Sequence, residues 1–279
     1  MFSWQRTTTV RLIVMYDPNS LENIDEDLLK KVYPFIKRVV IPYHRAEVRG
    51  LERIPKGPAL YVGNHSGATL SVDTFIWCAE AYRVHGLDAF PHGLAHDLVM
   101  DLPGLNHVIC PLGGIRASHE NARRAFAAGG KLVVYPGGDL ESYRPYRDRN
   151  RVMFAGRKGF ARLAIANNVP FIPVVAHGAH GTLRILHDFE GLAKLLKLHE
   201  RFRFGRLPLS FALPYGLWLG PMPPYFPLPS RITVEILEPI YLEGGQEAAD
   251  DDDYVSEVAD KVEAVIQDAL TRLARELEP

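Results

Sequence analysis

A histidine that follows an apolar run is the first candidate for chemistry in this sequence. The run ends at Gly63, and Asn64, His65, Ser66 and Gly67 come next. A histidine with a pKa near neutrality can take a proton from a hydroxyl group, and α/β proteins present reactive side chains just beyond the carboxyl end of a strand. We therefore predict that His65 acts as a general base and that its three neighbours bind substrate.

A general-base histidine works best when a carboxylate fixes its tautomer and stabilises the imidazolium that forms. Asp73 is the nearest carboxylate downstream of His65. On one helix their side chains would lie about 80° apart, so the segment 66–71 must form a loop that turns Asp73 back toward His65. For His65 taken alone, a structural role as a helix cap or a core histidine stays open.

A pair of glycines, Gly113 and Gly114, comes shortly before Arg116, and Ser118 is placed to cap the helix that follows. Backbone N–H groups at such a helix start, together with an arginine, can bind a phosphate or a carboxylate. Arg116 is therefore a candidate substrate-binding residue. The alternative is an ordinary turn before a capped helix.

A second glycine pair, Gly137 and Gly138, follows the strand-like run 131–135. Without Cβ atoms these residues would let a ligand approach the main chain, although a tight structural turn explains them equally well. A cationic stretch, residues 144–158, begins at Arg144. It is predicted to bind the phosphates of a nucleotide-bearing donor or anionic lipid heads, with a solvated basic face as the alternative.

Composition argues against several other functions. Lys and Arg total 32 against 33 for Asp and Glu, so the chain has no global attraction for nucleic acid. Cys78 and Cys110 match no redox or metal-ligand spacing, which favours a reduced, cytoplasmic setting without disulfides. His92 and His96 lack the glutamate of hydrolytic zinc helices, so neither a metal nor another cofactor is expected. The Gly-x-Ser-x-Gly elbow of serine hydrolases does not occur.

Alternating strand and helix patterns predict the α/β fold that would position these residues. We expect a layered fold with a central mixed, largely parallel sheet flanked by helices. Strands are predicted at residues 59–62, 131–135, 171–175 and 232–237, and helices at residues 73–83, 118–128, 156–167 and 251–277. The predicted organisation is an N-terminal segment, residues 1–44, and one domain over residues 45–279 that includes the last helix.

The N-terminal segment is predicted to contain an amphipathic helix from Asp25 to Pro42, kinked at Pro34. Cationic residues occupy its polar face: Lys30, Lys31, Lys37 and Arg38. This helix either packs on the protein's own core or lies on a membrane surface. No run of roughly 18 apolar residues occurs, so we expect a peripheral protein on the inner face of the cell membrane. An apolar, proline-rich stretch, residues 207–229, could likewise cover an acyl chain, enter the lipid interface or form ordinary core and loop.

Taken in order, four blocks of this sequence resemble the glycerolipid and lysophospholipid acyltransferase superfamily. They are residues 64–67 with Asp73, residues 113–116, residues 135–138 and residues 169–174, and the resemblance covers roughly residues 45–240. The Pro-Gly-Gly form of the third block is most similar to the bacterial diacylglycerol acyltransferase type 2-like branch. The resemblance implies that His65 and Asp73 form a catalytic pair and that Arg116 helps to shape the acceptor site.

The sequence departs from the common family pattern at two places. Seven residues separate His65 from Asp73, where the usual pattern has four. Gly137 stands where phosphate-acceptor members usually carry a glutamate, which favours a neutral or unusual hydroxylated lipid as the acceptor.

The resemblance implies transfer of a fatty acyl group from acyl-CoA, as co-substrate, to a hydroxyl of a glycerolipid or another lipid alcohol. The expected partners are therefore acyl-CoA, a lipid acceptor and a membrane surface. Two other functions stay open. A hydrolase could use the same histidine and aspartate to activate water, and a noncatalytic protein could bind lipid without turnover.

Overall fold

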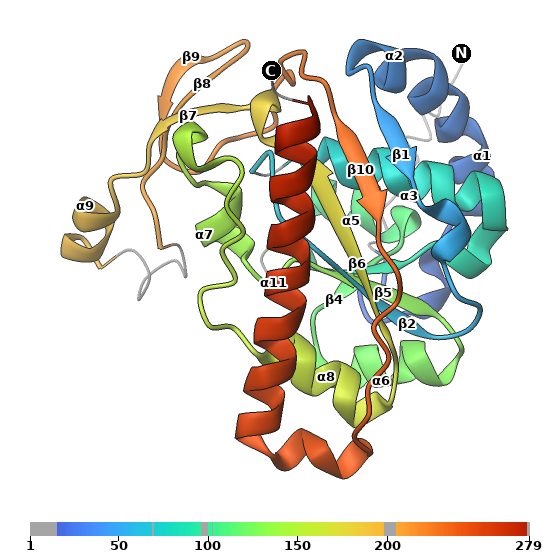
Figure 1. The fold of residues 1–279 in the computed structure, drawn as a ribbon. Helices are drawn as coiled ribbons and strands as arrows, with labels where there is room; N and C mark the ends of the chain where they lie inside the picture. The colour runs from blue at the N-terminus through green and yellow to red at the C-terminus, as the bar shows by residue number, and fades with distance from the viewer. Residues whose placement is uncertain (1–15, 69, 96–99, 102, 198–204, 278–279) are drawn as a thin grey trace, which may run out of the picture.

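A seven-stranded sheet forms the centre of the molecule in the computed structural model shown in Figure 1. The structure describes residues 16–68, 70–95, 100–101, 103–197 and 205–277. The strand order is β1-β10-β6-β2-β5-β3-β4. The strands are β1 (Glu47–Arg49), β2 (Ala59–Gly63), β3 (His92–Ala95), β4 (Gly114–Arg116), β5 (Lys131–Val134), β6 (Phe171–His177) and β10 (Thr233–Ile236).

Five neighbouring strands of this sheet, β6, β2, β5, β3 and β4, run parallel to one another. Strand β10 is antiparallel to β6, and β1 is parallel to β10. The prediction of a mixed, largely parallel sheet flanked by helices is therefore confirmed. The carboxyl ends of the five parallel strands meet at one edge, which we call the carboxyl edge.

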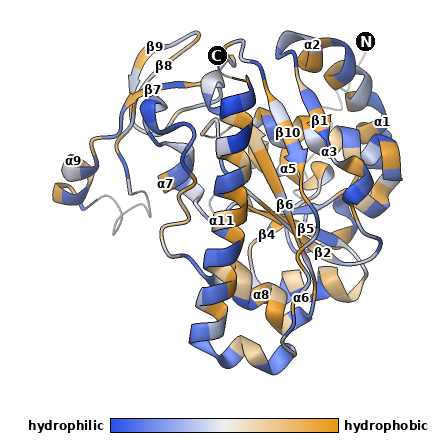
Figure 2. Cartoon of the chain, in the orientation of Figure 1, coloured by the Kyte–Doolittle hydropathy of each residue, from blue (hydrophilic) through white to orange (hydrophobic). Residues whose placement is uncertain are grey.

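Helices cover both faces of the sheet (Figure 2). One face packs on α6 (His119–Ala127), α8 (Gly159–Asn167) and α11 (Asp252–Leu277), and the other on α1 (Glu26–Phe35) and α3 (Val72–His85). The side chains of strand β2 alternate between the two faces of the sheet. Leu60 and Val62 belong to the first core cluster, whereas Ala59 and Tyr61 belong to the second, as the two-residue period of a strand requires.

A smaller antiparallel sheet lies beside the main one, with the order β7-β8-β9. Its strands are β7 (Arg184–His187), β8 (Leu209–Ala212) and β9 (Gly216–Leu219). Residues of this region, including Ile185 and Ala212, share a buried cluster with Ala68 and Tyr143. The small sheet therefore packs on the turn that follows β2. The other described helices are α2 (Ile41–Tyr43), α5 (Pro103–Ile109), α7 (Gly138–Ser142) and α9 (Glu190–Leu195).

The N-terminal helix continues past Pro34 in an altered form. Helix α1 is followed by a π-helical turn, Ile36–Val40, and then by α2. Pro34 has no N–H to donate to the carbonyl one turn back, and the π-helical turn begins two residues after it. Of the helices in the described ranges, none combines the length and the apolar character that a bilayer-spanning segment requires.

Candidate active site

The side chain of Asn64 places His65 at the carboxyl edge. Its Nδ2 donates to Ala176 O at 2.9 Å and its Oδ1 accepts from Ala176 N at 2.8 Å. These bonds tie the chain to β6 one residue beyond the end of β2, so His65 begins the turn outside the sheet. Because Asn64 is buried and both ends of its amide are engaged, it supports the turn rather than contacting substrate as predicted.

Two buried ionisable side chains hold the main chain of His65. The His65 N–H donates to Glu141 Oε2 at 2.8 Å, and His65 O accepts from Arg144 Nη1 at 2.6 Å. Glu141 and Arg144 are both 0% exposed. The position of His65 therefore depends on a segment almost eighty residues away in the sequence.

Hydrogen bonds to Ser71 define the tautomer of His65. Ser71 Oγ lies 3.2 Å from His65 Nδ1 and also 3.2 Å from Ser66 O. Since a carbonyl can only accept, the single hydroxyl hydrogen goes to Ser66 O, and Ser71 Oγ accepts the Nδ1–H. Nε2 then carries the lone pair, and none of the described residues forms a hydrogen bond with it. This tautomer is the one that a general base requires.

Asp73 lies in the first turn of α3 and is 1% exposed. Among the described residues it forms no hydrogen bond with His65, and its Oδ1 has no partner. Burial raises the pKa of Asp73 to about 7, although the N–H groups of Asp73 and Thr74 favour its ionised form. Ser71, rather than the predicted Asp73, is thus the side chain at His65 Nδ1 in this structure.

The imidazole of His65 is neutral at pH 7. Burial, aided by the positive charge of Arg144, lowers the pKa of His65 to about 4. The ring also packs beside Tyr135, with 5.0 Å between the ring centroids. Gly63 permits this packing, because a Cβ there would lie 2.8 Å from Tyr135 Cε1. The sequence showed Tyr135 within a motif but gave no reason to assign it this contact.

Glu141 occupies the space beside Gly137. A Cβ at Gly137 would lie 2.3 Å from Glu141 Oε2 and 2.6 Å from Met153 O. The carboxylate is held there because Glu141 Oε1 accepts from Met153 N at 3.1 Å, while Oε2 accepts from His65. Sequence reasoning missed this residue. The spacing in the sequence could have predicted this contact, because residues four apart lie on the same face of a helix and Glu141 is four residues after Gly137.

The space beside Gly138 is filled as well. Gly138 has a φ of +50°, and a Cβ there would lie 2.4 Å from Arg157 Nη1, which donates to Pro136 O at 3.0 Å. Protein side chains therefore adjoin both glycines where an approaching ligand was predicted. Gly138 thus serves the tight turn that the sequence left open as an alternative, because its φ is positive, and Gly137 leaves room for Glu141 and the carbonyl of Met153.

Arg144 has no donor left for a substrate. Its Nε donates to Asp148 O, its Nη1 to the carbonyls of His65 and Glu141, and its Nη2 to Ser66 Oγ and Arg149 O. These five contacts match the five N–H groups of a guanidinium. The predicted phosphate ligand is thus a buried structural cation.

Ser66 and Gly67, also predicted to bind substrate, form the turn after His65. Ser66 is 1% exposed. Gly67 has a φ of +75°, which favours glycine, and its carbonyl accepts from Tyr225 OH at 2.8 Å. Both residues therefore help to position His65 instead of presenting free polar groups.

Arg116 lies at the same edge as His65 but farther along it. It ends β4, which is three strands from β2 and so about 14 Å away. Its Nη2 lies 2.6 Å from Asp101 Oδ1. The structure therefore does not place Arg116 beside the imidazole, and an acceptor-binding role for it stays a prediction.

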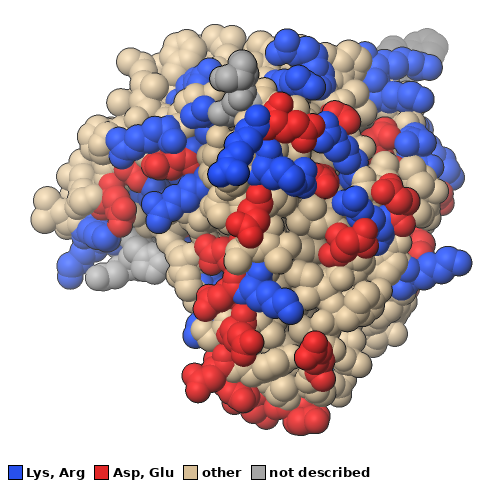
Figure 3. Space-filling view, viewed as in Figure 1, with Lys and Arg blue, Asp and Glu red and all other residues tan. Residues whose placement is uncertain are grey.

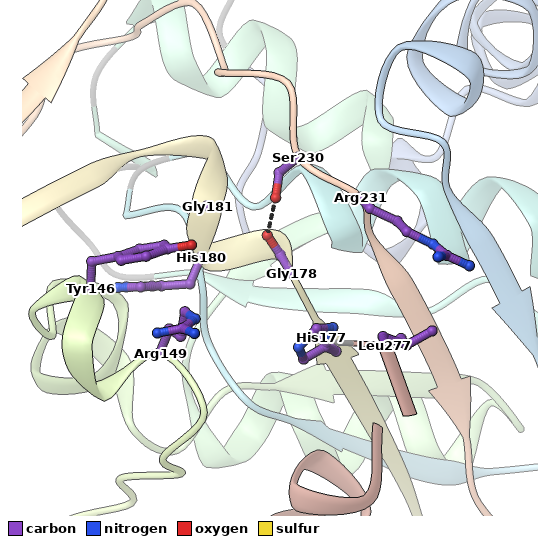
Figure 4. Close-up of a pocket in the computed structure, with 9 residues that line it drawn as sticks. All are labelled: Tyr146, Arg149, His177, Gly178, His180, Gly181, Ser230, Arg231 and Leu277. Carbon is purple, nitrogen blue, oxygen red and sulfur yellow. Dashed lines mark hydrogen bonds between the residues drawn. The ribbon is translucent and has the colours of Figure 1, made fainter. Parts of the chain in front are cut away.

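A cavity of about 170 Å³ lies at the carboxyl end of β6 (Figure 4). Its lining includes His177, His180 and Arg149, together with Leu277 at the end of α11. His180 Nε2 donates to Arg144 O at 2.8 Å. The cavity thus adjoins the residues that hold His65, but His65 itself does not line it.

Comparison with known proteins gives a match to a family model and a match to a solved fold. Residues 45–177 match the family model described as Acyltransferase. The crystal structure of the 1-acyl-sn-glycerophosphate acyltransferase PlsC from Thermotoga maritima has a similar fold, with a TM-score of 0.54 and 19% sequence identity. The match covers 89% of this chain and 80% of that chain.

Two groups of relatives are similar in sequence. An uncharacterised protein of Mycobacterium leprae is 31% identical over 245 residues, which are 87% of this chain and 64% of that protein. The mouse protein named DGAT1/2-independent enzyme synthesizing storage lipids is 31% identical over 201 residues, which are 70% of this chain and 56% of that protein. The chain thus spans less than two thirds of these relatives. Residues 45–177, slightly less than half of the chain, thus match an acyltransferase family model, and the fold is similar to that of PlsC.

Proposed function

We propose that this protein transfers a fatty acyl group from a thioester donor, acyl-CoA, to a hydroxyl group of a lipid alcohol, with His65 as general base. The observation that carries this proposal is the state of His65 itself. Its ring is neutral, its Nδ1–H is held by Ser71, and its Nε2 is left to accept a proton.

The reaction needs no covalent intermediate on the protein. His65 Nε2 takes the proton of the acceptor hydroxyl as the oxygen attacks the thioester carbonyl, which gives a tetrahedral oxyanion. Collapse of this oxyanion breaks the carbon–sulfur bond and forms the ester. The departing thiolate takes the proton back from the imidazolium, so His65 returns to its neutral form.

Asp73 is proposed as the carboxylate that stabilises the imidazolium. It is buried, its Oδ1 has no partner among the residues that the structure describes, and it is two residues from Ser71, which contacts the ring. A cation on His65 would favour the ionised form of Asp73 over the protonated form that burial favours. Ser71 would then orient the ring, and Asp73 would supply the compensating charge.

The acceptor is proposed to be a neutral lipid alcohol rather than a lipid phosphate. The third sequence block carries Gly137 in place of glutamate, and Arg144, the first cation after it, is fully buried and engaged. The name of the mouse relative, an enzyme synthesizing storage lipids, supports the same class of acceptor. With both substrates being lipids, we also place the protein peripherally at the inner face of the cell membrane.

Acyl transfer can be tested with a panel of donors and acceptors. Long-chain acyl-CoA and acyl carrier protein thioesters would be offered with diacylglycerol, monoacylglycerol, a long-chain alcohol and lysophosphatidic acid, and the new ester would be measured. We expect the ester with acyl-CoA and a neutral acceptor. Thioester loss without an ester would indicate a hydrolase, and lipid binding without turnover would indicate a noncatalytic protein.

A further inference from the structure

Two arginine side chains lie over the ring of Tyr146, which belongs to the segment after α7. The guanidinium carbon of Arg184, at the start of β7, is 3.8 Å from the centroid of this ring, and that of Arg149 is 4.8 Å from it. Both distances are within the range of cation–π contacts. We call Tyr146, Arg149 and Arg184 the arginine cluster.

The guanidinium of Arg184 has no acidic partner in the described part of the chain. Its side chain is exposed, and its contact with Tyr146 is the one interaction that it makes there. At 3.8 Å the planar guanidinium is close enough to stack on the ring, and stacking leaves its in-plane N–H groups for another acceptor. Arg184 is thus a cation that the protein holds in place without neutralising it.

The arginine cluster adjoins the cavity at the carboxyl end of β6. Tyr146 and Arg149 line this cavity, and Figure 4 shows them on one side of it beside His180, with His177 on the other. Arg231, which is exposed, lines the cavity too. Of the described residues in the lining, none is acidic. A space with such a lining favours an anion.

Acidic side chains close to this region in the sequence are paired with other cations. Asp148 Oδ2 lies 3.6 Å from Arg147 Nε, and Glu276 Oε1, in the last turn of α11, lies 2.8 Å from Arg49 Nη1. Many acidic side chains gather at the other end of the molecule, where α11 begins (Figure 3). The region of the arginine cluster therefore keeps a surplus of positive charge.

Arg144 ties the arginine cluster to the turn of His65. Its Nη1 donates to His65 O, and its own carbonyl accepts from His180 in the cavity wall. Tyr146 follows two residues later, and two residues span at most about 7 Å. The arginine cluster is therefore close to His65, although the ring that packs beside the imidazole is that of Tyr135.

We propose that the arginine cluster binds the phosphates in the nucleotide part of an acyl-CoA donor. The pantetheine arm of acyl-CoA separates the thioester from these phosphates, so their site is expected near the general base but not in contact with it. A guanidinium forms paired hydrogen bonds with phosphate oxygens. The inference rests on the proposed function, which supplies the donor, and adds to it the site that holds the donor's nucleotide.

Binding of adenosine 3′,5′-bisphosphate, measured by isothermal titration calorimetry, tests this site without catalysis. The probe carries the 3′-phosphate of CoA and has no thioester. We expect the wild type to bind it, and to bind it more weakly as salt rises. Arg184→Gln should raise the Kd by about tenfold, because one charge-assisted hydrogen bond to phosphate is lost. Since Arg184 is exposed, the variant should fold like the wild type, which circular dichroism would check.

Arg123→Gln is the matched control. Arg123 is also exposed, but it pairs with Glu120 on α6, at the other end of the molecule from the end of α11 (Figure 1). Its replacement should leave the Kd unchanged. No binding by the wild type, or equal binding by the wild type and Arg184→Gln, would overturn the inference. Tighter binding of glycerol 3-phosphate than of the bisphosphate would also overturn it, because the cations would then serve a lipid headgroup.

Kinetics with two donors separates this inference from the proposed function. Acyl-pantetheine has the thioester of acyl-CoA but no phosphate. In Arg184→Gln, the ratio of kcat/KM for acyl-CoA to kcat/KM for acyl-pantetheine should fall by about tenfold, mainly through the KM of acyl-CoA. Acyl transfer with an unchanged ratio would refute the inference and leave the proposed function standing. If the wild type binds the bisphosphate through Arg184 but transfers no acyl group from either donor, the proposed function fails and the phosphate site stands.

Discussion

Replacing Glu141 with glutamine would test whether the buried segment after the second glycine pair positions the base. Glu141→Gln keeps the shape of the side chain but removes its charge and one acceptor. The two carboxylate oxygens accept from the N–H groups of His65 and Met153. A glutamine has one carbonyl oxygen, so one of these N–H groups would face an amide NH₂.

The size of the effect follows from burial. A buried donor left without an acceptor costs roughly 1–3 kcal/mol. The raised pKa of Glu141 acts in the opposite direction, because the wild-type native state loses stability as the pH rises through about 7, so the free energy of unfolding of Glu141→Gln should increase relative to wild type from pH 5.5 to pH 8. If the unsatisfied donor is that of His65, the imidazole shifts relative to the substrate. A displacement of about 1 Å can lower turnover by on the order of a hundredfold, and we expect a loss in kcat of about tenfold to a hundredfold with little change in KM.

Urea denaturation and steady-state kinetics at pH 8 would measure both effects. Burial raises the pKa of Glu141 to about 7, so at pH 5.5 the wild-type carboxyl is protonated and the ratio of wild-type to variant kcat should approach one. Glu190→Gln is the matched control, because Glu190 is exposed and pairs with Lys194 on the surface. A folded Glu141→Gln protein with wild-type kcat at pH 8 would refute the positioning role.

Four further outcomes are expected. Ser71→Ala should lower kcat several-fold and Ser71→Thr should restore it in the same kinetic assay, because the hydroxyl holds His65 Nδ1; an unaffected Ser71→Ala enzyme would mean another group holds it. Gly137→Ala should lower the free energy of unfolding by about 1–3 kcal/mol through overpacking, whereas Gly159→Ala, with no atom near its new Cβ, should not. Burial raises the pKa of Asp73 from 3.8 to about 7, so the native state keeps a proton that the unfolded chain releases, and wild type loses stability as the pH rises between these values. In urea denaturation, Asp73→Asn should therefore gain stability relative to wild type from pH 5.5 to pH 8, and a constant difference would contradict the raised pKa. Because the pKa of His65 is about 4, its protonation should not reduce kcat/KM between pH 8 and pH 6 in a Glu141→Gln/Asp73→Asn variant, which lacks the two carboxyls with pKa values of about 7, and an acid limb near pH 6.5 in that variant would mean an exposed imidazole.

The main elements of the fold could be predicted because their patterns are local. The apolar run of β2 and the long stripe of α11 are evident in the sequence, and both lie within one or two residues of their predicted positions. Strand β4, with three residues, carries no pattern of its own and takes its structure from pairing with β3. Short edge strands of this kind depend on the sheet that they join.

The candidate base could be predicted, whereas its surroundings could not. His65 follows a recognisable strand, but its contacts come from Glu141, Arg144 and Ser71, which the tertiary fold brings to it. Arg144 is the clearest example of a residue whose role could not be predicted from the sequence. A cluster of cations in the sequence suggests a surface that binds phosphate, and only the structure shows that the first of them is buried.

Acyl transfer by the wild type and by His65→Ala, each shown to be folded by circular dichroism, is the most direct test of the mechanism. Free thiol and new ester would be measured together from acyl-CoA and the best neutral acceptor at pH 8. We expect one ester for each thiol in the wild type and loss of both products in His65→Ala. Ester formation by His65→Ala at a rate close to that of the wild type would show that His65 is not the base.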